Sequence, residues 1–204
     1  MKKLLLLLLF LSTCFIASAD TVTYYSDGYS AGTVWTTTPA NMVDGSISTW
    51  TTTGENPDNQ LLNSTTCDGT DLGTITKVEM RTYGYVDSYS GGDEIHITPS
   101  FDGGTGDDHD MGDIYVAWSS WVDITSDTNA PDPYTWGAFG ISGLYLSVEG
   151  YSVTTEVSVA KVEVKVTYIA STGYANDVGG VASANIAKVS GVATADIAKV
   201  GGVE

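Results

Sequence analysis

The side chains best suited to chemistry in this sequence are carboxylates that surround a glycine-rich segment. Residues 87–123 contain nine aspartates and glutamates and no lysine or arginine. Among them, Asp102 opens the run DGGTGDDHD, which also supplies Asp107, Asp108 and Asp110. Closely spaced carboxylates on a loop bent by glycines suit a hard cation such as Ca2+. These four aspartates are candidate ligands of a metal ion. We do not expect the protein to require a cofactor. The alternative is a solvated loop between strands.

Aromatic side chains are the second chemical resource, because the chain has five tryptophans and twelve tyrosines. Sugar rings pack on exposed aromatic faces, while polar side chains hold the hydroxyl groups. We take Trp50, Tyr83, Tyr85 and Tyr89 as candidate ligand-binding residues on that ground. Strands and cores also favour aromatic residues, so most of the others are expected to pack inside the fold.

Catalysis is not predicted. The segment GYSAG at 28–32 matches the GxSxG nucleophile motif, but that motif needs a helix directly after it, and TVWTTTP at 33–39 predicts none. His109 has no second histidine near it in sequence, as a zinc site would require. We therefore expect a protein without enzymatic activity.

The elements that position these side chains are predicted to be short strands. Apolar and aromatic runs recur between clusters of Gly, Asp, Asn and Pro, and no stretch has a long amphipathic helical period. A helical turn is expected only at 134–141. The pattern predicts an all-β fold, an antiparallel jelly-roll β-sandwich. The predicted strands cover residues 21–25, 34–38, 75–85, 94–98, 113–118, 121–125, 143–149 and 157–169.

The clearest of these strands is 157–169, VSVAKVEVKVTYI. Its valines from Val162 onward have one parity of the alternation, whereas Val157 and Val159 have the opposite parity. A β-bulge at 160–161 would return both halves to the same buried face. We expect that bulge, and we expect this strand to close the domain.

Two short motifs resemble those of a known family. The run NMVDGSISTW at 41–50, followed by DLG at 71–73 before a strand, resembles the discoidin-like (coagulation factor 5/8 type C) and related galactose-binding-like domains. The resemblance covers about residues 20–170 and implies a jelly-roll fold, loops that bind sugars, and Asp44 as a ligand of a structural calcium. Where that family tends to have a glutamate on the last strand, this sequence has Lys161, and lysine does not ligate calcium.

The N-terminus predicts export. Residues 1–19 combine a basic start, an apolar stretch and the small-x-small site ASA, the layout of a secretory signal peptide. The alternative is lipidation at Cys14, since LSTC resembles a lipobox. Cleavage after Ala19 would leave Cys67 as the only cysteine, so no internal disulfide is available. We expect a secreted protein, extracellular or at a cell surface, with no transmembrane segment.

The charge is strongly acidic, with a formal net charge of −17. Residues 20–170 contain 22 acidic side chains against four basic ones. Nucleic acid is bound through lysine and arginine, so this balance excludes it as a partner. Cations, neutral sugars and other proteins stay possible ligands.

The C-terminal part differs in composition. After a linker at 171–179, the tail at 180–204 repeats GVASANIAKVS and GVATADIAKVG with a period of 11 residues. Each junction reads Val-(Gly/Ser)-Gly-Val, which favours a tight hairpin; a short helical turn in each repeat is the alternative. The tail resembles the IAKVNGVA-type tails of phage and metagenomic surface proteins. Two such units cannot bury their own valines, so they are expected to pack on the sandwich, a sister chain or another partner.

Two functions are compatible with these observations. The first is a non-catalytic extracellular structural or adhesive subunit that displays the sandwich and uses the repeats for assembly with itself or attachment to a surface protein. The second is a carbohydrate-binding module of the discoidin-like kind, with glycans as ligands.

Overall fold

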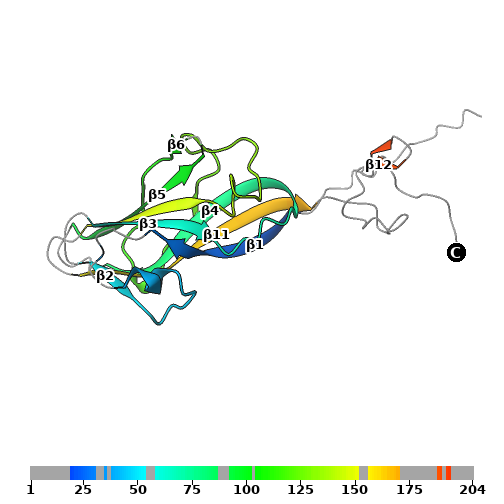
Figure 1. Cartoon of the computed structure of the whole chain (residues 1–204). Coiled ribbons are helices and arrows are strands. Elements are labelled where there is room, and N and C mark those ends of the chain that lie inside the picture. Colours follow the sequence, from blue (N-terminus) through cyan, green and yellow to red (C-terminus); the bar gives the residue numbers. More distant parts are fainter. Residues whose placement is uncertain are drawn as a thin grey trace, which may run out of the picture.

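The computed structural model describes residues 19–30, 35, 38–53, 58–86, 92–102, 104–151 and 156–170, and the backbone of 188–189 and 192–193. Its strands up to Ala170 form an antiparallel sandwich of two sheets that share β1 (Figure 1). The first sheet contains β1 (Ala19–Tyr29), β11 (Val157–Ala170), β4 (Gly73–Tyr85), β8 (Tyr115–Trp118), β9 (Val122–Asp123) and β2 (Thr51–Thr53). The second contains the end of β1, β3 (Asp58–Thr65), β10 (Tyr145–Tyr151), β5 (Glu94–Phe101), β6 (Gly104–Thr105) and β7 (His109–Asp110). The predicted all-β, antiparallel jelly-roll sandwich is confirmed.

Strand β1 joins the two sheets. Its residues up to Tyr25 pair with β11, and its residues from Ser26 onward pair with β3. The register shifts on both sides of Gly28, where an added Cβ would collide with the Ser64 hydroxyl. A strand with such irregularities can bend from one layer to the other, which closes that side of the sandwich.

Strand β11 lies between β1 and β4 and contains the predicted bulge. Its register with β4 shifts between Val159 and Lys161, so Ala160 is the extra residue. Val159 and Val162 are both fully buried, while Lys161 points to the outer face. The change of parity seen in the sequence therefore has the predicted physical cause.

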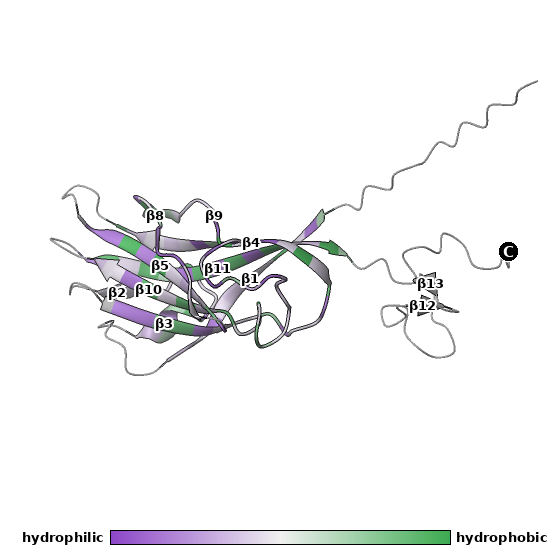
Figure 2. Cartoon of the chain, turned by 90° about the horizontal axis from the view of Figure 1, so that it is seen from above, coloured by the Kyte–Doolittle hydropathy of each residue, from purple (hydrophilic) through white to green (hydrophobic). Residues whose placement is uncertain are grey.

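The core lies between the two sheets. Apolar and polar residues alternate along the strands that enclose it (Figure 2). Fully buried side chains come from both layers, chiefly Val78, Met80, Ile95, Ile97, Leu146, Val148, Val162, Val164 and Val166. A core of this size accounts for a fold that uses no disulfide, in which the described cysteine, Cys67, is free and buried.

Four strands of the sandwich, β2, β3, β6 and β7, were not predicted, because their sequences lack an apolar alternation. In β3, the inward-facing positions are Gln60 and Leu62, and the amide of Gln60 donates to the carbonyl oxygens of Ser30 and Leu61. Hydrogen bonds thus satisfy a buried polar side chain where a valine would be expected. Strand β2 consists of three threonines, two of them buried.

The predictions at two other segments differ from the structure. Of the strand predicted at 34–38, the two described residues, Trp35 and Thr38, belong to no strand; a 3-10 helix, η1 (Pro39–Met42), follows them. The helical turn expected at 134–141 is a series of hydrogen-bonded turns instead. Glycines at 137, 140 and 143 interrupt any helical run there.

The described part of the tail is a hairpin. Strands β12 (Lys188–Val189) and β13 (Val192–Ala193) pair antiparallel, with Val189 opposite Val192. This confirms the hairpin alternative at that junction. The signal peptide, the linker and the rest of the tail lie outside the described residues. In the described part of the chain, no helix is both long and apolar enough to cross a membrane.

Candidate functional site

Asp44, the calcium ligand implied by the family resemblance, holds its own loop together. Its Oδ1 accepts the backbone N–H of Ser46 at 2.8 Å, and its Oδ2 accepts the Thr49 hydroxyl at 2.6 Å. The loop packs on Tyr25, whose ring a Cβ at Gly45 would touch at 2.9 Å. The carboxylate therefore sets the position of the residue after Thr49, which is Trp50.

Three of the four other candidate metal ligands, Asp107, Asp108 and Asp110, accept hydrogen bonds from protein groups. Asp107 accepts the backbone N–H of Thr128 at 3.2 Å, and this hydrogen bonding lowers the pKa of the Asp107 carboxyl. Asp108 accepts the hydroxyl of Thr98 at 3.0 Å and lies 2.7 Å from Nδ1 of His96. These carboxylates attach their loop to β5 and to the segment before residue 130.

Asp110 accepts the backbone N–H of Gly112 at 2.8 Å, and Asp102 lies apart from the others at the end of β5. Among the described residues, no group of three or more His, Cys, Asp or Glu side chains is placed to hold a metal ion. The structure thus disperses the predicted ligands, and calcium binding stays a prediction.

Both histidines of the chain contact carboxylates in or beside this acidic loop. His96 lies 2.9 Å from Glu94 on its other ring nitrogen, and His109 lies 2.8 Å from Asp127. Burial lowers the pKa of His96, but the hydrogen bonds to Asp108 and Glu94 raise it, and the net shift is upward. A protonated His96 would compensate for part of the negative charge around it.

Two of the four predicted ligand-binding aromatics, Trp50 and Tyr83, belong to a row of rings on the outer face of the first sheet. We call Trp50, Tyr83 and Trp118 the aromatic row: the ring centroids of neighbours are 5.5 and 5.3 Å apart. Tyr85 contacts Tyr115 at 5.3 Å beside it. The structure therefore brings Trp50 and Tyr83 together. The fourth candidate, Tyr89, lies outside the described residues.

Cationic side chains lie over the ring at one end of the aromatic row and over the neighbouring Trp121. The guanidinium of Arg81 lies over the rings of Trp118 and Trp121, at 4.0 and 4.2 Å from their centroids, and Lys165 lies 4.2 Å over Trp121. Arg81 also binds Glu163 with N–O distances of 2.7 and 2.9 Å. These rings have protein partners on their faces, so the row is a packed surface of the sheet.

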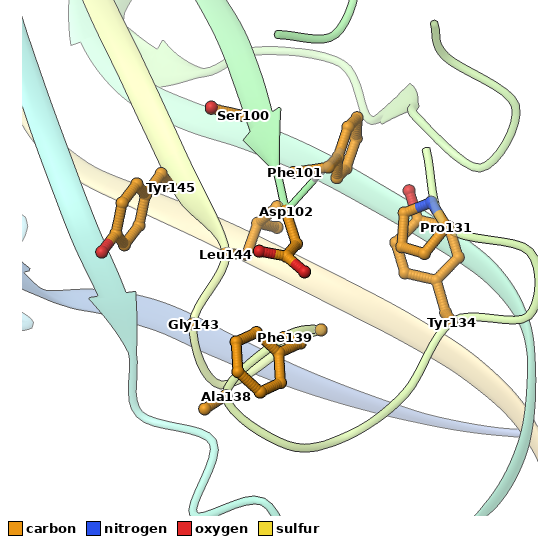
Figure 3. Close-up of a pocket in the computed structure, with 11 residues that line it drawn as sticks. Ser100, Phe101, Asp102, Pro131, Tyr134, Ala138, Phe139, Gly143, Leu144 and Tyr145 are labelled. Carbon is orange, nitrogen blue, oxygen red and sulfur yellow. The ribbon is translucent and has the colours of Figure 1, made fainter. Parts of the chain in front are cut away.

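A pocket of about 270 Å3 lies at one end of the second sheet, where β5 ends and β10 begins (Figure 3). The segment 131–144 forms its other wall. Its lining residues are Ser100, Phe101, Asp102, Pro131, Tyr134, Ala138, Phe139, Gly140, Gly143, Leu144 and Tyr145. None of them is a lysine or an arginine.

The pocket has an aromatic rim and an aromatic floor. At the rim, Phe139 is 75% exposed and Tyr145 is 44% exposed. At the floor, Phe101 and Tyr134 meet edge to face with centroids 6.0 Å apart, and the Tyr134 hydroxyl donates to the carbonyl of Ile124 at 2.9 Å. Burial raises the pKa of Tyr134, which keeps that hydroxyl protonated. Asp102 lies at the centre of this group (Figure 3).

The turns at 137–143 place Phe139 at the rim. Gly140 N–H donates to the carbonyl of Gly137 at 2.9 Å, and Ile141, whose side chain is fully buried, anchors the segment. A Cβ at Gly140 would collide with the Thr135 carbonyl oxygen, so only glycine fits there. Phe139 and Tyr145 were not among the candidates. The signal that could have found them is the aromatic residue set between glycines in WGAFGISG at 136–143.

Comparisons with known proteins yield structural likenesses only. No protein-family model matches the chain. No curated protein matches it either. Among solved structures, the CBM32 of AlyQ in complex with 4,5-unsaturated mannuronic acid has a TM-score of 0.37 and 15% identity, over 71% of this chain and 95% of that one. A truncated AlyQ with CBM32 and alginate lyase domains has a TM-score of 0.41 and 14% identity, over 77% of this chain and 36% of that one. At these values, neither likeness bears on what this chain binds.

Proposed function

We propose that this chain is a non-catalytic carbohydrate-binding protein whose pocket holds one sugar ring against Phe139 and Tyr145. The observation that carries the proposal is the exposure of these two rings at the mouth of a cavity. Single exposed rings are common on protein surfaces, but two exposed rings together at the mouth of a cavity form a surface that a ligand can cover. Sugars offer apolar C–H faces for such rings and hydroxyls for the polar groups beside them.

The size and polar groups of the pocket support this ligand class. Its volume of about 270 Å3 lies just below the range of about 300–1,000 Å3 typical of small-molecule sites, which suits a single ring and not an extended chain. Ser100 supplies a hydroxyl, Tyr145 a phenol and Asp102 a carboxylate. These groups can bind hydroxyls by hydrogen bonds while the rings pack against carbon.

The aromatic row is a less suitable surface for a sugar. Its rings already contact one another, and Arg81 lies over Trp118. A ligand would have to displace these contacts, whereas the rim of the pocket offers rings without such partners among the described contacts. Ligand binding by Trp50, Tyr83, Tyr85 and Tyr89 stays a prediction.

The test is sugar binding by the mature chain and by three single variants. We expect ligand-observed NMR and a glycan array to detect binding that Phe139→Ala and Tyr145→Ala each weaken about tenfold, because each removes a stacking face. Tyr115→Ala is the matched control, since Tyr115 is equally exposed, at 75%, but does not line the pocket. Equal binding by all four proteins, or binding by none, would reject the proposal.

A second proposal concerns attachment, and the β12–β13 hairpin supports it. We propose that the chain is exported, that residues 1–19 are removed, and that the repeats at 180–204 attach the sandwich to another copy or to a surface protein. The hairpin is too small to bury its own valines. Truncation after Ala170 should leave sugar binding intact and abolish self-association or surface attachment, measured by light scattering and cell-binding assays. A monomeric full-length chain that binds no surface would contradict it.

A further inference from the structure

Resting on the proposed function, we infer that the sugar held in the pocket carries a positive charge, an amino sugar with a free ammonium group, and that Asp102 is its counter-ion. Asp102 differs from the other acidic residues of its loop. Asp107, Asp108 and Asp110 each accept hydrogen bonds from protein groups. Asp102 has no hydrogen bond or ion pair to another described residue, yet it occupies the centre of the pocket (Figure 3).

Every lysine and arginine side chain in the described part of the chain is already paired with an acidic side chain other than Asp102. The four described lysine and arginine side chains lie on the outer face of β4 and β11, where they bind acidic side chains. The ion pairs are Lys77–Glu79, Lys165–Glu79, Lys77–Asp123, Arg81–Glu163 and Lys161–Glu163. Asp102 is exposed to water and has no protein cation beside it, so a cationic ligand in the pocket is the group that can pair with its carboxylate.

The surroundings of Asp102 favour an ammonium group. Aromatic rings present negative faces, and four of them line the pocket: Phe101, Tyr134, Phe139 and Tyr145. The chain as a whole carries a formal charge of −17, which attracts cations and repels anions. A bare metal ion is a poorer occupant, because one carboxylate supplies too few of the six to eight oxygens that Ca2+ takes.

Asp102 is also held in place before any ligand binds. It lies between β5 and β6, where Phe101 pairs with Gly104. The turn is fixed from outside, because the side-chain amide of Asn129 donates to the carbonyl of Thr105 at 2.8 Å, and Gly106 N–H donates to the carbonyl of Pro99 at 2.8 Å. These contacts set the position of the backbone that carries the Asp102 side chain.

The experiment compares three sugars of similar size and different charge. Glucosamine, glucose and glucuronate are titrated into the mature chain in slightly acidic buffer, where the amine is protonated, and binding is followed by ligand-observed NMR. We expect glucosamine to bind about tenfold more tightly than glucose, and glucuronate more weakly than glucose. Added salt should reduce the preference for glucosamine and leave glucose unaffected.

Two variants complete the design. Asp102→Asn keeps the shape of the side chain and should bring glucosamine to the affinity of glucose. Asp113→Asn removes the same charge from an exposed residue outside the pocket and should leave the order unchanged. The inference fails if glucose and glucosamine bind equally, or if the order survives in Asp102→Asn. Glucose binding that Phe139→Ala weakens would then uphold the proposed function alone, whereas no binding of any sugar would reject both.

Discussion

The aromatic row and the pocket use the same kinds of residues in opposite ways. In the row, Trp118 faces Tyr83 on one side and the guanidinium of Arg81 on another, and the cation continues to Trp121. In the pocket, Phe139 is mostly exposed and has no ring partner in the described part of the chain. An aromatic side chain therefore indicates a ligand site only when the fold leaves its face without a partner.

The difference follows from how the two regions are built. The row lies across adjacent strands, where outward side chains at alternate positions of β4, such as Arg81 and Tyr83, are brought beside those of β8. Packing between them is then unavoidable. The pocket is formed by a strand end, a strand start and a series of turns, so its walls stand apart and leave a space between them.

Among the variants that test the difference between the row and the pocket, Arg81→Ala is expected to change stability most. The change removes a cation from between two indoles and leaves Glu163, whose side chain is only 11% exposed, with Lys161 as its one remaining cation. We expect the free energy of unfolding to fall by about 2 kcal/mol, measured by urea denaturation. Sugar binding should not change. A fully stable variant would mean that the stack is not structural.

A smaller effect is expected from Trp50→Ala. The ring contacts Tyr83 at the end of the row, so its loss should cost about 1 kcal/mol of stability. Binding of sugars to the pocket should stay unchanged, with Phe139→Ala as the contrasting variant in the same NMR assay. If Trp50→Ala abolished binding instead, the ligand would belong to the row, and the comparison would be reversed.

The smallest effect is expected for the dependence of stability on pH, through His96 on β5. The pKa of His96 in the folded chain lies above its ordinary value of 6.5. Its contribution to stability is therefore complete below the pKa of the unfolded chain and is lost as the pH rises through the folded pKa. Urea denaturation at about pH 6 and about pH 8 should give the lower stability at the higher pH.

The groups that face His96 are Glu94, Asp108, Asp110, Glu149 and Tyr151, of which none is cationic. His96→Gln should remove this pH dependence. A pH dependence that is unchanged in His96→Gln would show that the histidine does not carry it.

The sequence predicted what regular alternation determines. The fold class, the strand at 157–169 and the bulge at Ala160 follow from side-chain parity, and the hairpin at 188–193 follows from two turn residues between valines. Strand β3 could not be predicted in the same way, because hydrogen bonds from Gln60 satisfy a buried polar position. Trp50 and Tyr83 were each candidates, but neither their contact with each other nor the contact of Arg81 with two indoles follows from the sequence.

The pocket was beyond prediction for a different reason. Phe139, Tyr145 and Asp102 come from three segments that only the folded chain brings together. Asp102 was selected from the sequence as a metal ligand, on the strength of neighbours that turn out to bind protein groups. Its place at the centre of an aromatic pocket depends on where β5 ends and on the turns at 137–143, which no periodic pattern encodes.

The central position of β11 has a mechanical consequence. The strand pairs with β4 over nearly its whole length and with β1 from Glu163 to Ile169, and the repeat tail continues the chain beyond Ala170. A force applied to the tail therefore acts along the axis of β11. Such a load is shared by the hydrogen bonds of both ladders at once, so they must yield together and not one after another. If the tail bears load, as its proposed role in attachment implies, this shear arrangement is the one that resists extension best.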